Sequence, residues 1–226
     1  MTRRLDPSAL ALHLVTDTAL SAPRTVPDVV AAAVAGGAGM VQVREKDASV
    51  RDLVALLVAV AERVGRDVPV LVDDRADAYL AARASGAPVA GVHVGQSDLP
   101  VELARRICGP EAVLGLSAAT DEELAAASAL PPGTVDYLGV GAVRATRTKP
   151  DHPEPLGVEG FARAAARTSL PCLAIGGVRV EDAAGLRAAG AAGLAVVSGI
   201  CADPDPGAAA GRYLRAFHGL PAGVVA

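Results

Sequence analysis

The chain has 226 residues, of which 51% are hydrophobic and 20% are charged, and its formal net charge is −4. This composition excludes a disordered chain, a collagen and a small disulfide-stabilised domain. No apolar run reaches the roughly 18 residues that a membrane span requires, and the first residues do not resemble a secretory signal. Because aromatic residues make up only 2% and no basic excess exists, we expect neither nucleic-acid nor membrane partners.

The use of cysteine and lysine gives two further indications. The three cysteines, Cys108, Cys172 and Cys201, include no CxxC pair, which predicts reduced thiols and a cytoplasmic protein. Only two of the 21 basic residues are lysines, Lys46 and Lys149. Lysine in such an arginine-rich chain indicates positions that need a compact ammonium group. The alternative is that the placement of only two lysines has no functional significance.

Short apolar, β-branched segments alternate along the chain with segments of helical spacing. Strands are predicted at 11–16, 40–44, 70–73, 91–94, 113–117, 137–140, 172–175 and 194–198. Helices are predicted between and after them at 27–35, 50–64, 76–84, 99–107, 121–129, 158–167, 180–189 and 206–217. Eight strand–helix units favour parallel pairing and predict an α/β protein with a closed (β/α)8 TIM barrel.

No linker or change of composition divides the chain. We therefore predict a single domain over residues 1–226, with short tails at about 1–10 and 219–226. The competing fold is a doubly wound open sheet, which usually has fewer strands and a glycine-rich turn after the first one. Here the first predicted strand continues into Thr16 and Asp17, so the barrel is favoured.

Polar residues end the second predicted strand. In a barrel of this kind the chemistry lies at the carboxyl ends of the strands. Strand alternation places Gln42 and Arg44 on one face, with Lys46 just beyond the strand. If the intervening valines face the helices, these polar side chains point into the mouth of the barrel. The alternative is an internal ion pair without a binding role.

Carboxylates end the third and fourth predicted strands. Asp74 and Asp98 reach one rim from neighbouring strands, and Mg²⁺ is commonly held by one or two carboxylates together with phosphate oxygens. The alternative is that these residues cap the helices that follow them. His93 lies in the middle of its strand, where a packed, hydrogen-bonded core histidine is favoured over a catalytic one.

Hydroxyl groups and a lysine follow the fifth and sixth predicted strands. Ser117 ends the fifth strand, and its single hydroxyl is a weak signal. Thr146, Thr148 and Lys149 follow the sixth strand and could together hold an anion, or could form a solvated basic loop.

Glycines follow the seventh and eighth strands, at Gly176–Gly177 and next to Ser198. They allow backbone N–H groups to approach a phosphate at the place where barrels most often bind one. The cations and carboxylates elsewhere on the rim indicate a second, more highly charged group. The sequence therefore favours two phosphorylated substrates, one of which loses diphosphate.

The chain resembles the thiamine phosphate synthase family across nearly its whole length. The resemblance is carried by the segments 14–17, 41–46, 91–100, 116–117, 146–149, 174–178 and 196–198. It implies a transferase of thiamine biosynthesis that joins 4-amino-2-methyl-5-(diphosphooxymethyl)pyrimidine to 4-methyl-5-(2-phosphooxyethyl)thiazole and releases diphosphate with Mg²⁺. It also implies a dissociative reaction, in which the pyrimidine C–O bond breaks before the thiazole nitrogen captures the methylene cation.

The resemblance also implies roles for individual residues. The residues expected to hold the pyrimidine diphosphate are Gln42, Arg44, Lys46, Asp73, Ser117 and Lys149. Among them, the expected catalytic residues are Arg44, Lys46, Ser117 and Lys149. Mg²⁺ would be bound by Asp74 and Asp98. The thiazole phosphate would be held by Thr146, Thr148, Gly177, Val197 and Ser198.

Two positions depart from the family pattern. Asp73 stands where the family usually has asparagine, and Ala142 follows Gly141 where the family usually has proline. An ionised aspartate only accepts hydrogen bonds, so Asp73 bears on substrate affinity.

The alternative functions are a thiazole tautomerase-like isomerase on the same barrel and a non-catalytic barrel that binds phosphate metabolites. A homo-oligomer also stays open.

Overall fold

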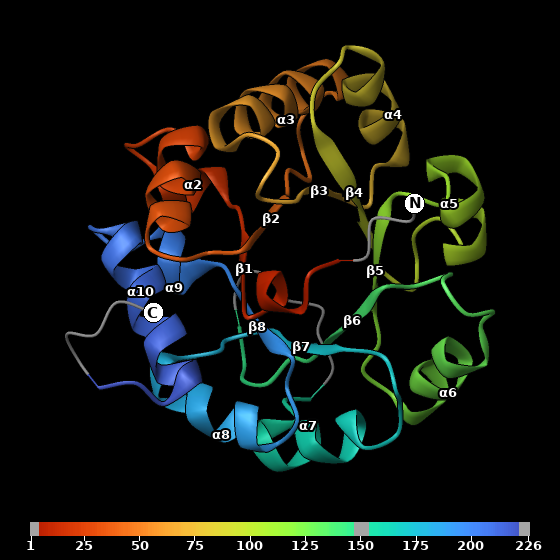
Figure 1. Cartoon of the computed structure of the whole chain (residues 1–226), viewed down its shortest axis with the longest axis vertical. Helices are drawn as coiled ribbons and strands as arrows, with labels where there is room; N and C mark the ends of the chain where they lie inside the picture. The colour runs from red at the N-terminus through yellow and green to blue at the C-terminus, as the bar shows by residue number, and fades with distance from the viewer. Residues whose placement is uncertain (1–4, 147–153, 222–226) are drawn as a thin grey trace.

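The computed structural model describes residues 5–146 and 154–221, and its centre is a closed barrel of eight parallel strands in chain order (Figure 1). The strands are β1 Leu12–Val15, β2 Met40–Val43, β3 Val70–Asp73, β4 Val89–Val94, β5 Val113–Ser117, β6 Tyr137–Val140, β7 Cys172–Ala174 and β8 Gly193–Val196. Pairing of β1 with β8 closes the barrel. The predicted single-domain (β/α)8 barrel is confirmed.

Helices surround the barrel on its outside (Figure 1). The α-helices are α1 Thr18–Ser21, α2 Val26–Ala35, α3 Val50–Val64, α4 Ala76–Ala84, α5 Val101–Cys108, α6 Asp121–Ala129, α7 Gly157–Ala165, α8 Ala183–Ala188, α9 Ser198–Cys201 and α10 Pro206–His218. The 3-10 helices within the described residues are η1 Pro7–Leu10 and η2 Val180–Asp182.

The structure differs from the prediction in several short elements. The single-turn helices α1 and α9 directly follow β1 and β8, and the helix predicted at 180–189 is divided into η2 and α8. The last strand ends at Val196, so Ser198 opens α9 instead of ending the strand. Helices of one turn are too short to show a hydrophobic period, which is why the sequence did not reveal them.

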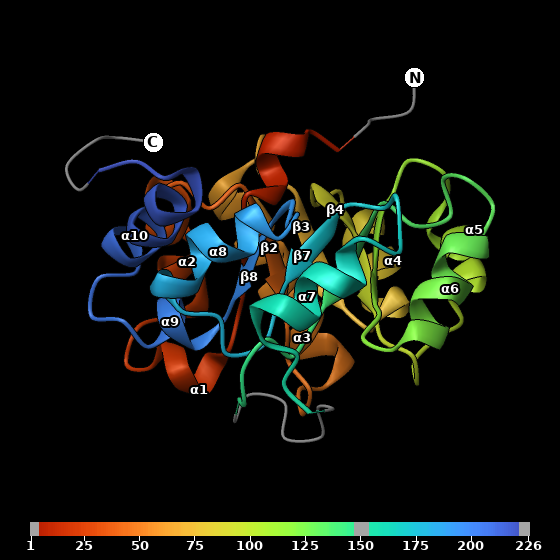
Figure 2. The same cartoon turned by 90° about the horizontal axis from the view of Figure 1, so that it is seen from below.

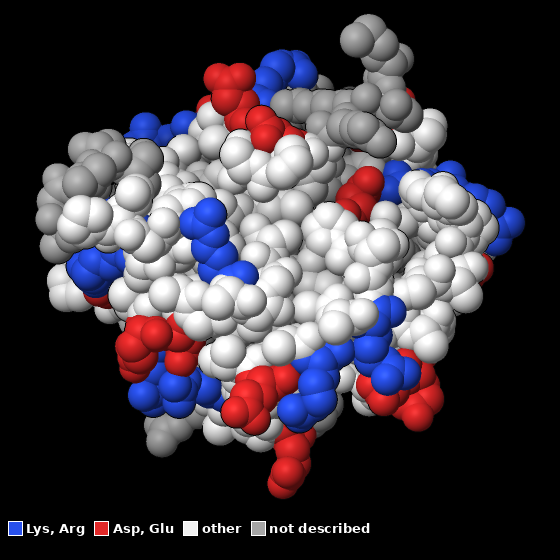
Figure 3. Space-filling model, turned by 60° about the horizontal axis from the view of Figure 1, so that its bottom comes forward, with Lys and Arg blue, Asp and Glu red and all other residues white. Residues whose placement is uncertain are grey.

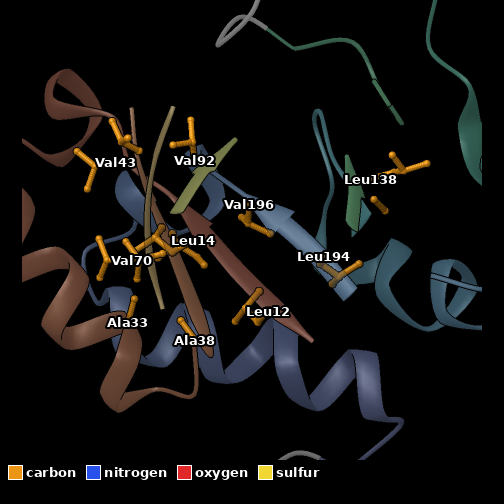
Figure 4. Close-up of a cluster of buried hydrophobic side chains, with 14 of the residues drawn as sticks. Leu12, Leu14, Ala33, Ala38, Val43, Val70, Val92, Leu138, Leu194 and Val196 are labelled. Atoms are coloured by element: carbon orange, nitrogen blue, oxygen red, sulfur yellow. The ribbon is translucent and has the colours of Figure 1, made fainter. Parts of the chain in front are cut away.

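The main hydrophobic core lies between the strands and the surrounding helices. Leu12 and Leu14 of β1 alternate with inward-facing residues and pack with Val196 of β8 and Ala33 of α2 (Figure 4). All four side chains are buried. The strands therefore present every second residue to this outer layer, which leaves the residues between them to fill the barrel and to line its mouth.

The N-terminal segment closes the bottom of the barrel. Leu10 of η1 is 3% exposed and packs with Met40, Leu71 and Leu173 inside the barrel. Figure 2 shows η1, drawn in red, at one end of the barrel, and α1 and α9 at the opposite end. The predicted N-terminal tail thus contains four residues that are folded against the barrel.

Replacing Leu10 by alanine is expected to lower the free energy of unfolding by about 2–4 kcal/mol, because the inner cluster loses a buried side chain and gains a cavity. Urea denaturation measures this loss. Leu80→Ala is the matched control, since Leu80 is 43% exposed on α4. Equal losses in the two variants would show that η1 contributes no packing to the barrel.

The outer surface carries both signs of charge. On the face drawn in Figure 3, acidic and basic side chains of the described residues lie interspersed and form no continuous basic surface. None of the helices within residues 5–146 and 154–221 has the length and apolar character of a membrane span. The cysteines are free thiols, and those of Cys172 and Cys201 are buried.

Candidate active site

A cavity of about 420 Å³ lies at the carboxyl ends of the strands. Eleven of the predicted site residues line this one cavity. They are Gln42, Arg44, Lys46, Asp73, Asp74, Asp98, Ser117, Thr146, Gly177, Val197 and Ser198. The remaining two, Thr148 and Lys149, lie outside the described residues. The strand alternation read from the sequence thus places Gln42 and Arg44 in the mouth, but their roles stay predictions.

Asp73 is the centre of a partly buried polar cluster on one side of the cavity. Gln42 Nε2 donates to Asp73 Oδ1 at 2.5 Å, and Arg44 Nε and Lys46 Nζ each lie 3.5 Å from Asp73 Oδ2. Burial raises the pKa of Asp73, although Lys46, Arg44 and Gln42 act in the opposite direction. The internal ion pair considered as an alternative therefore exists, and the same side chains also face the cavity.

Strand β1 helps to position Arg44. The backbone N–H of Arg44 donates to Thr16 Oγ1 at 3.1 Å, and the N–H of Thr16 donates to the carbonyl of Gln42 at 2.9 Å. Thr16 is fully buried. These two bonds continue the β1–β2 pairing beyond the strands, so the rim residues start from a rigid backbone.

Asp74 and Asp98 lie at the mouth next to Lys46. Lys46 Nζ donates to Asp74 Oδ2, and the N–H of Gly95 donates to Asp98 Oδ2 at 2.9 Å. Burial alone would lower the pKa of Lys46, but the Asp74 and Asp73 carboxylates together raise it. Burial and a hydrogen bond with Asp74 both raise the pKa of Asp98. The carboxylates of Asp74 and Asp98 are therefore close together.

Helix capping does not account for these carboxylates. The residues that precede α4 and α5 are Arg75 and Pro100, and neither makes a side-chain capping bond. Asp74 instead has a left-handed backbone, with φ of 61°, which is uncommon outside glycine, asparagine and aspartate. The backbone at this position turns the carboxylate towards the cavity instead of the helix.

Ser117 lies beside a buried pair of side chains at the floor of the cavity. His93 Nε2 is 3.0 Å from Ser117 Oγ, and His93 Nδ1 is 2.9 Å from Tyr137 Oη. Gln96 Nε2 donates to the Ser117 carbonyl at 2.6 Å. His93 is a buried, hydrogen-bonded histidine, as predicted. Neither Tyr137 nor Gln96 was predicted from the sequence as a site residue.

The opposite side of the cavity is built from the loops after β6 and β7. Gly177 has φ of +65°, and a Cβ there would come within 2.9 Å of the Arg144 side chain, so glycine allows the two loops to touch. Arg144 Nε and Nη2 donate to the Asp182 carboxylate at 2.8 and 2.6 Å. Thr146 follows β6 and Ser198 follows β8, which are the neighbours of β7, and both residues line the cavity.

The fold and this mouth define a (β/α)8-barrel protein with a charged and polar pocket at the carboxyl ends of its strands. A family model described as thiamine monophosphate synthase matches residues 12–200. That match covers most of the chain and nearly all of the barrel. The chain therefore belongs to the thiamine monophosphate synthase family.

Curated relatives give the same result. The thiamine-phosphate synthase of Albidiferax ferrireducens is 46% identical over 205 residues, which cover 90% of this chain and 90% of the relative. That of Corynebacterium efficiens is 47% identical over 192 residues, which cover 85% of this chain and 88% of the relative. The protein is thus a transferase enzyme of thiamine biosynthesis with thiamine-phosphate synthase function and small-molecule substrates.

Solved structures agree with the fold. The thiamine phosphate pyrophosphorylase of Pyrococcus furiosus has a TM-score of 0.81 and 28% identity, and the match covers 94% of this chain and 98% of that one. A 3-hexulose-6-phosphate synthase has a TM-score of 0.65 at 18% identity, covering 92% of this chain and 99% of that one, which shows the barrel alone.

Proposed function

We propose that the enzyme joins 4-amino-2-methyl-5-(diphosphooxymethyl)pyrimidine to 4-methyl-5-(2-phosphooxyethyl)thiazole, giving thiamine phosphate and diphosphate. The observation that carries this proposal is the division of one cavity into a charged side and a side of glycines and hydroxyl groups. Arg44 and Lys46 lie with the carboxylates on one side, and the glycine loop after β7 lies on the other. Such a cavity suits two phosphorylated substrates whose reacting ends meet between the two sides.

The proposed reaction begins with cleavage of the bond between the pyrimidine methylene carbon and the diphosphate oxygen. The electron pair leaves with the diphosphate, and the methylene cation that remains is stabilised by the aminopyrimidine. The thiazole nitrogen then supplies its lone pair to form the new C–N bond. Since the difficulty lies in the charge of the leaving group, preorganised cations are the chief requirement, and no nucleophile is needed.

Arg44 and Lys46 would meet the leaving diphosphate. The Arg44 guanidinium can contact two phosphate oxygens at once, whereas the Lys46 ammonium gives one directed charge. Both cations already lie 3.5 Å from Asp73, so this partly buried carboxylate holds them in place before substrate binds. Asp73 would also accept a hydrogen bond from the pyrimidine amino group.

The residues at the mouth fit Mg²⁺. The described part of the chain contains no cluster of three or more metal-ligating side chains, but Asp74 and Asp98 offer two carboxylates close together. Mg²⁺ is usually bound by one or two carboxylates, waters and substrate phosphates, so this pair is the expected donor set. When bound, the ion would neutralise charge on the diphosphate.

The thiazole phosphate would be held at the other side of the cavity. Gly176 and Gly177 have positive φ, which allows backbone N–H groups to turn towards an anion. Thr146 and Ser198 add hydroxyl donors there.

The reduced thiols of the described residues support a cytoplasmic location for this reaction.

A diphosphate-release assay tests the proposal with both substrates, with and without Mg²⁺. Release that requires both substrates and the metal is the expected result. Release of no diphosphate, with isomerisation of a thiazole carboxylate instead, would point to the tautomerase alternative. Binding of thiazole phosphate without any turnover would point to the non-catalytic barrel, and Asp73→Asn would then show whether Asp73 prevents the reaction.

A further inference from the structure

We propose that the buried pair of His93 and Tyr137 is a positioning device that fixes the Ser117 hydroxyl as a hydrogen-bond donor towards the substrate. This inference deepens the proposed function, because it depends on Ser117 meeting an oxygen of the pyrimidine diphosphate. His93 and Tyr137 themselves act through Ser117 and are positioning residues.

Three neighbouring strands bring these side chains together. His93 of β4 is paired in register with Gly115 of β5, and Gly115 is in turn paired with Tyr137 of β6. Ser117 is two residues beyond Gly115 and therefore faces the same interior side of the barrel. His93 and Tyr137 are 6% and 1% exposed, so water competes little for their hydrogen bonds.

The direction of each hydrogen bond follows from the chemistry of the donors. Within the described residues, the Tyr137 hydroxyl has one hydrogen-bond partner, His93 Nδ1 at 2.9 Å. A buried hydroxyl proton without an acceptor is costly, so Tyr137 donates and His93 Nδ1 accepts. A neutral imidazole carries one N–H, which then lies on Nε2. His93 Nε2 therefore donates to Ser117 Oγ at 3.0 Å.

This order leaves the Ser117 proton for the cavity. Because Ser117 Oγ accepts from His93, its own O–H is directed to another acceptor, and Ser117 lines the cavity. Gln96 Nε2 holds the Ser117 carbonyl at 2.6 Å, which fixes the backbone on the other side. A donor at this position favours an anionic oxygen of a substrate over a second donor.

The barrel leaves space for this pair. A Cβ at Gly115 would lie 2.3 Å from His93 Nδ1 and 2.4 Å from Tyr137 Oη, at the position of their hydrogen bond. A Cβ at Gly139 would lie 3.2 Å from His93 Cε1. Two glycines on adjacent strands thus make room for the histidine–tyrosine contact, where any larger residue would separate the two rings.

Tyr137→Phe keeps the ring and removes the donor. The expected result is a rise in KM for the pyrimidine diphosphate of roughly 5- to 20-fold, as for a lost hydrogen bond, with a smaller change in kcat. Tyr79→Phe is the matched control, since Tyr79 is buried on α4 and outside the cavity. In a Ser117→Ala background, Tyr137→Phe is expected to add no further rise in KM.

Nitrogen-15 NMR of the ring nitrogens tests the proposal without substrate, and His93→Gln identifies the signals. The wild type is expected to show His93 as the neutral Nε2–H form, and Tyr137→Phe to show a mixture of tautomers. A wild-type Nδ1–H form, a charged ring or an additive effect in the Ser117→Ala background overturns the proposal.

Two variants of His93 separate the donor from the ring. His93→Gln, which retains a donor near the Nε2 position, is expected to keep KM closer to wild type than His93→Leu.

The two proposals can fail separately. An enzyme that shows the Nε2–H form but releases no diphosphate contradicts the proposed function while the tautomer assignment stands. An enzyme that releases diphosphate but keeps its KM in Tyr137→Phe contradicts the positioning role of the pair while the proposed function stands.

Discussion

Replacing Asp74 by alanine is expected to lower kcat/KM by at least about 30-fold, which corresponds to about 2 kcal/mol of transition-state stabilisation. The variant removes one of two adjacent carboxylates at the mouth and leaves Lys46 without its nearest partner. In the proposed reaction it would weaken Mg²⁺ binding, so the Mg²⁺ concentration needed for half-maximal diphosphate release should rise. Steady-state diphosphate release measured over a range of Mg²⁺ concentrations tests both effects.

The backbone at Asp74 decides how this experiment is controlled. Its φ of 61° strains alanine more than asparagine, so part of the loss in Asp74→Ala could come from the loop. Asp74→Asn keeps the left-handed preference and removes only the charge, and it is expected to lose nearly as much activity. Asp77→Ala is the matched control, because Asp77 is paired with Arg75 on the outside of α4. Near-normal turnover in Asp74→Asn would remove Asp74 from the proposed metal site.

The barrel could be predicted because its signal is repeated eight times. Each unit combines a short apolar strand with a longer helix, and an error in any one unit does not change the fold. The mouth residues could be predicted for a related reason. Strand alternation decides which face Gln42 and Arg44 occupy, and the ends of parallel strands must meet at one rim.

The contacts across strands could not be predicted in the same way. The distance between His93 and Tyr137 depends on the register of β4, β5 and β6, which a single sequence does not specify. One signal was available in the sequence. Gly139 is two residues from Tyr137 and Gly91 is two residues from His93, so each glycine lies on the same inward face as the ring and leaves space beside it. η1 was also missed, because four residues are too few for a helical pattern.

His13 places two ring nitrogens without hydrogen-bond partners among the described residues inside the barrel, which no sequence pattern indicated. It lies on β1, is 1% exposed and packs edge-on against Tyr137 with ring centroids 5.9 Å apart. Neither ring nitrogen has a hydrogen-bond partner within the described residues. Burial, with a smaller contribution from His93, lowers the pKa of His13 to about 3. The ring is therefore neutral in the folded protein at every pH near neutrality.

His13 is expected to make the protein less stable as the pH falls. The unfolded chain binds a proton at His13 near its ordinary pKa of 6.5, whereas the folded protein does so only near 3. Protonation thus favours unfolding between these values, and full stability is present only above pH 6.5. Through His13 alone, the free energy of unfolding should fall by about 2 kcal/mol between pH 7 and pH 5, and by about 4 kcal/mol between pH 7 and pH 3.

His13→Phe is expected to remove this part of the pH dependence, because phenylalanine fills a similar volume and does not titrate. Urea denaturation at pH 7 and pH 5 measures the difference for the wild type and the variant. His218→Gln is the control, since His218 is exposed at the end of α10, where burial and the neighbouring Arg187 lower its pKa. If His13→Phe loses as much stability as the wild type between the two pH values, His13 is not held neutral in the folded barrel. In that case, the His13 ring must be protonated inside the barrel, with an acceptor for its second N–H.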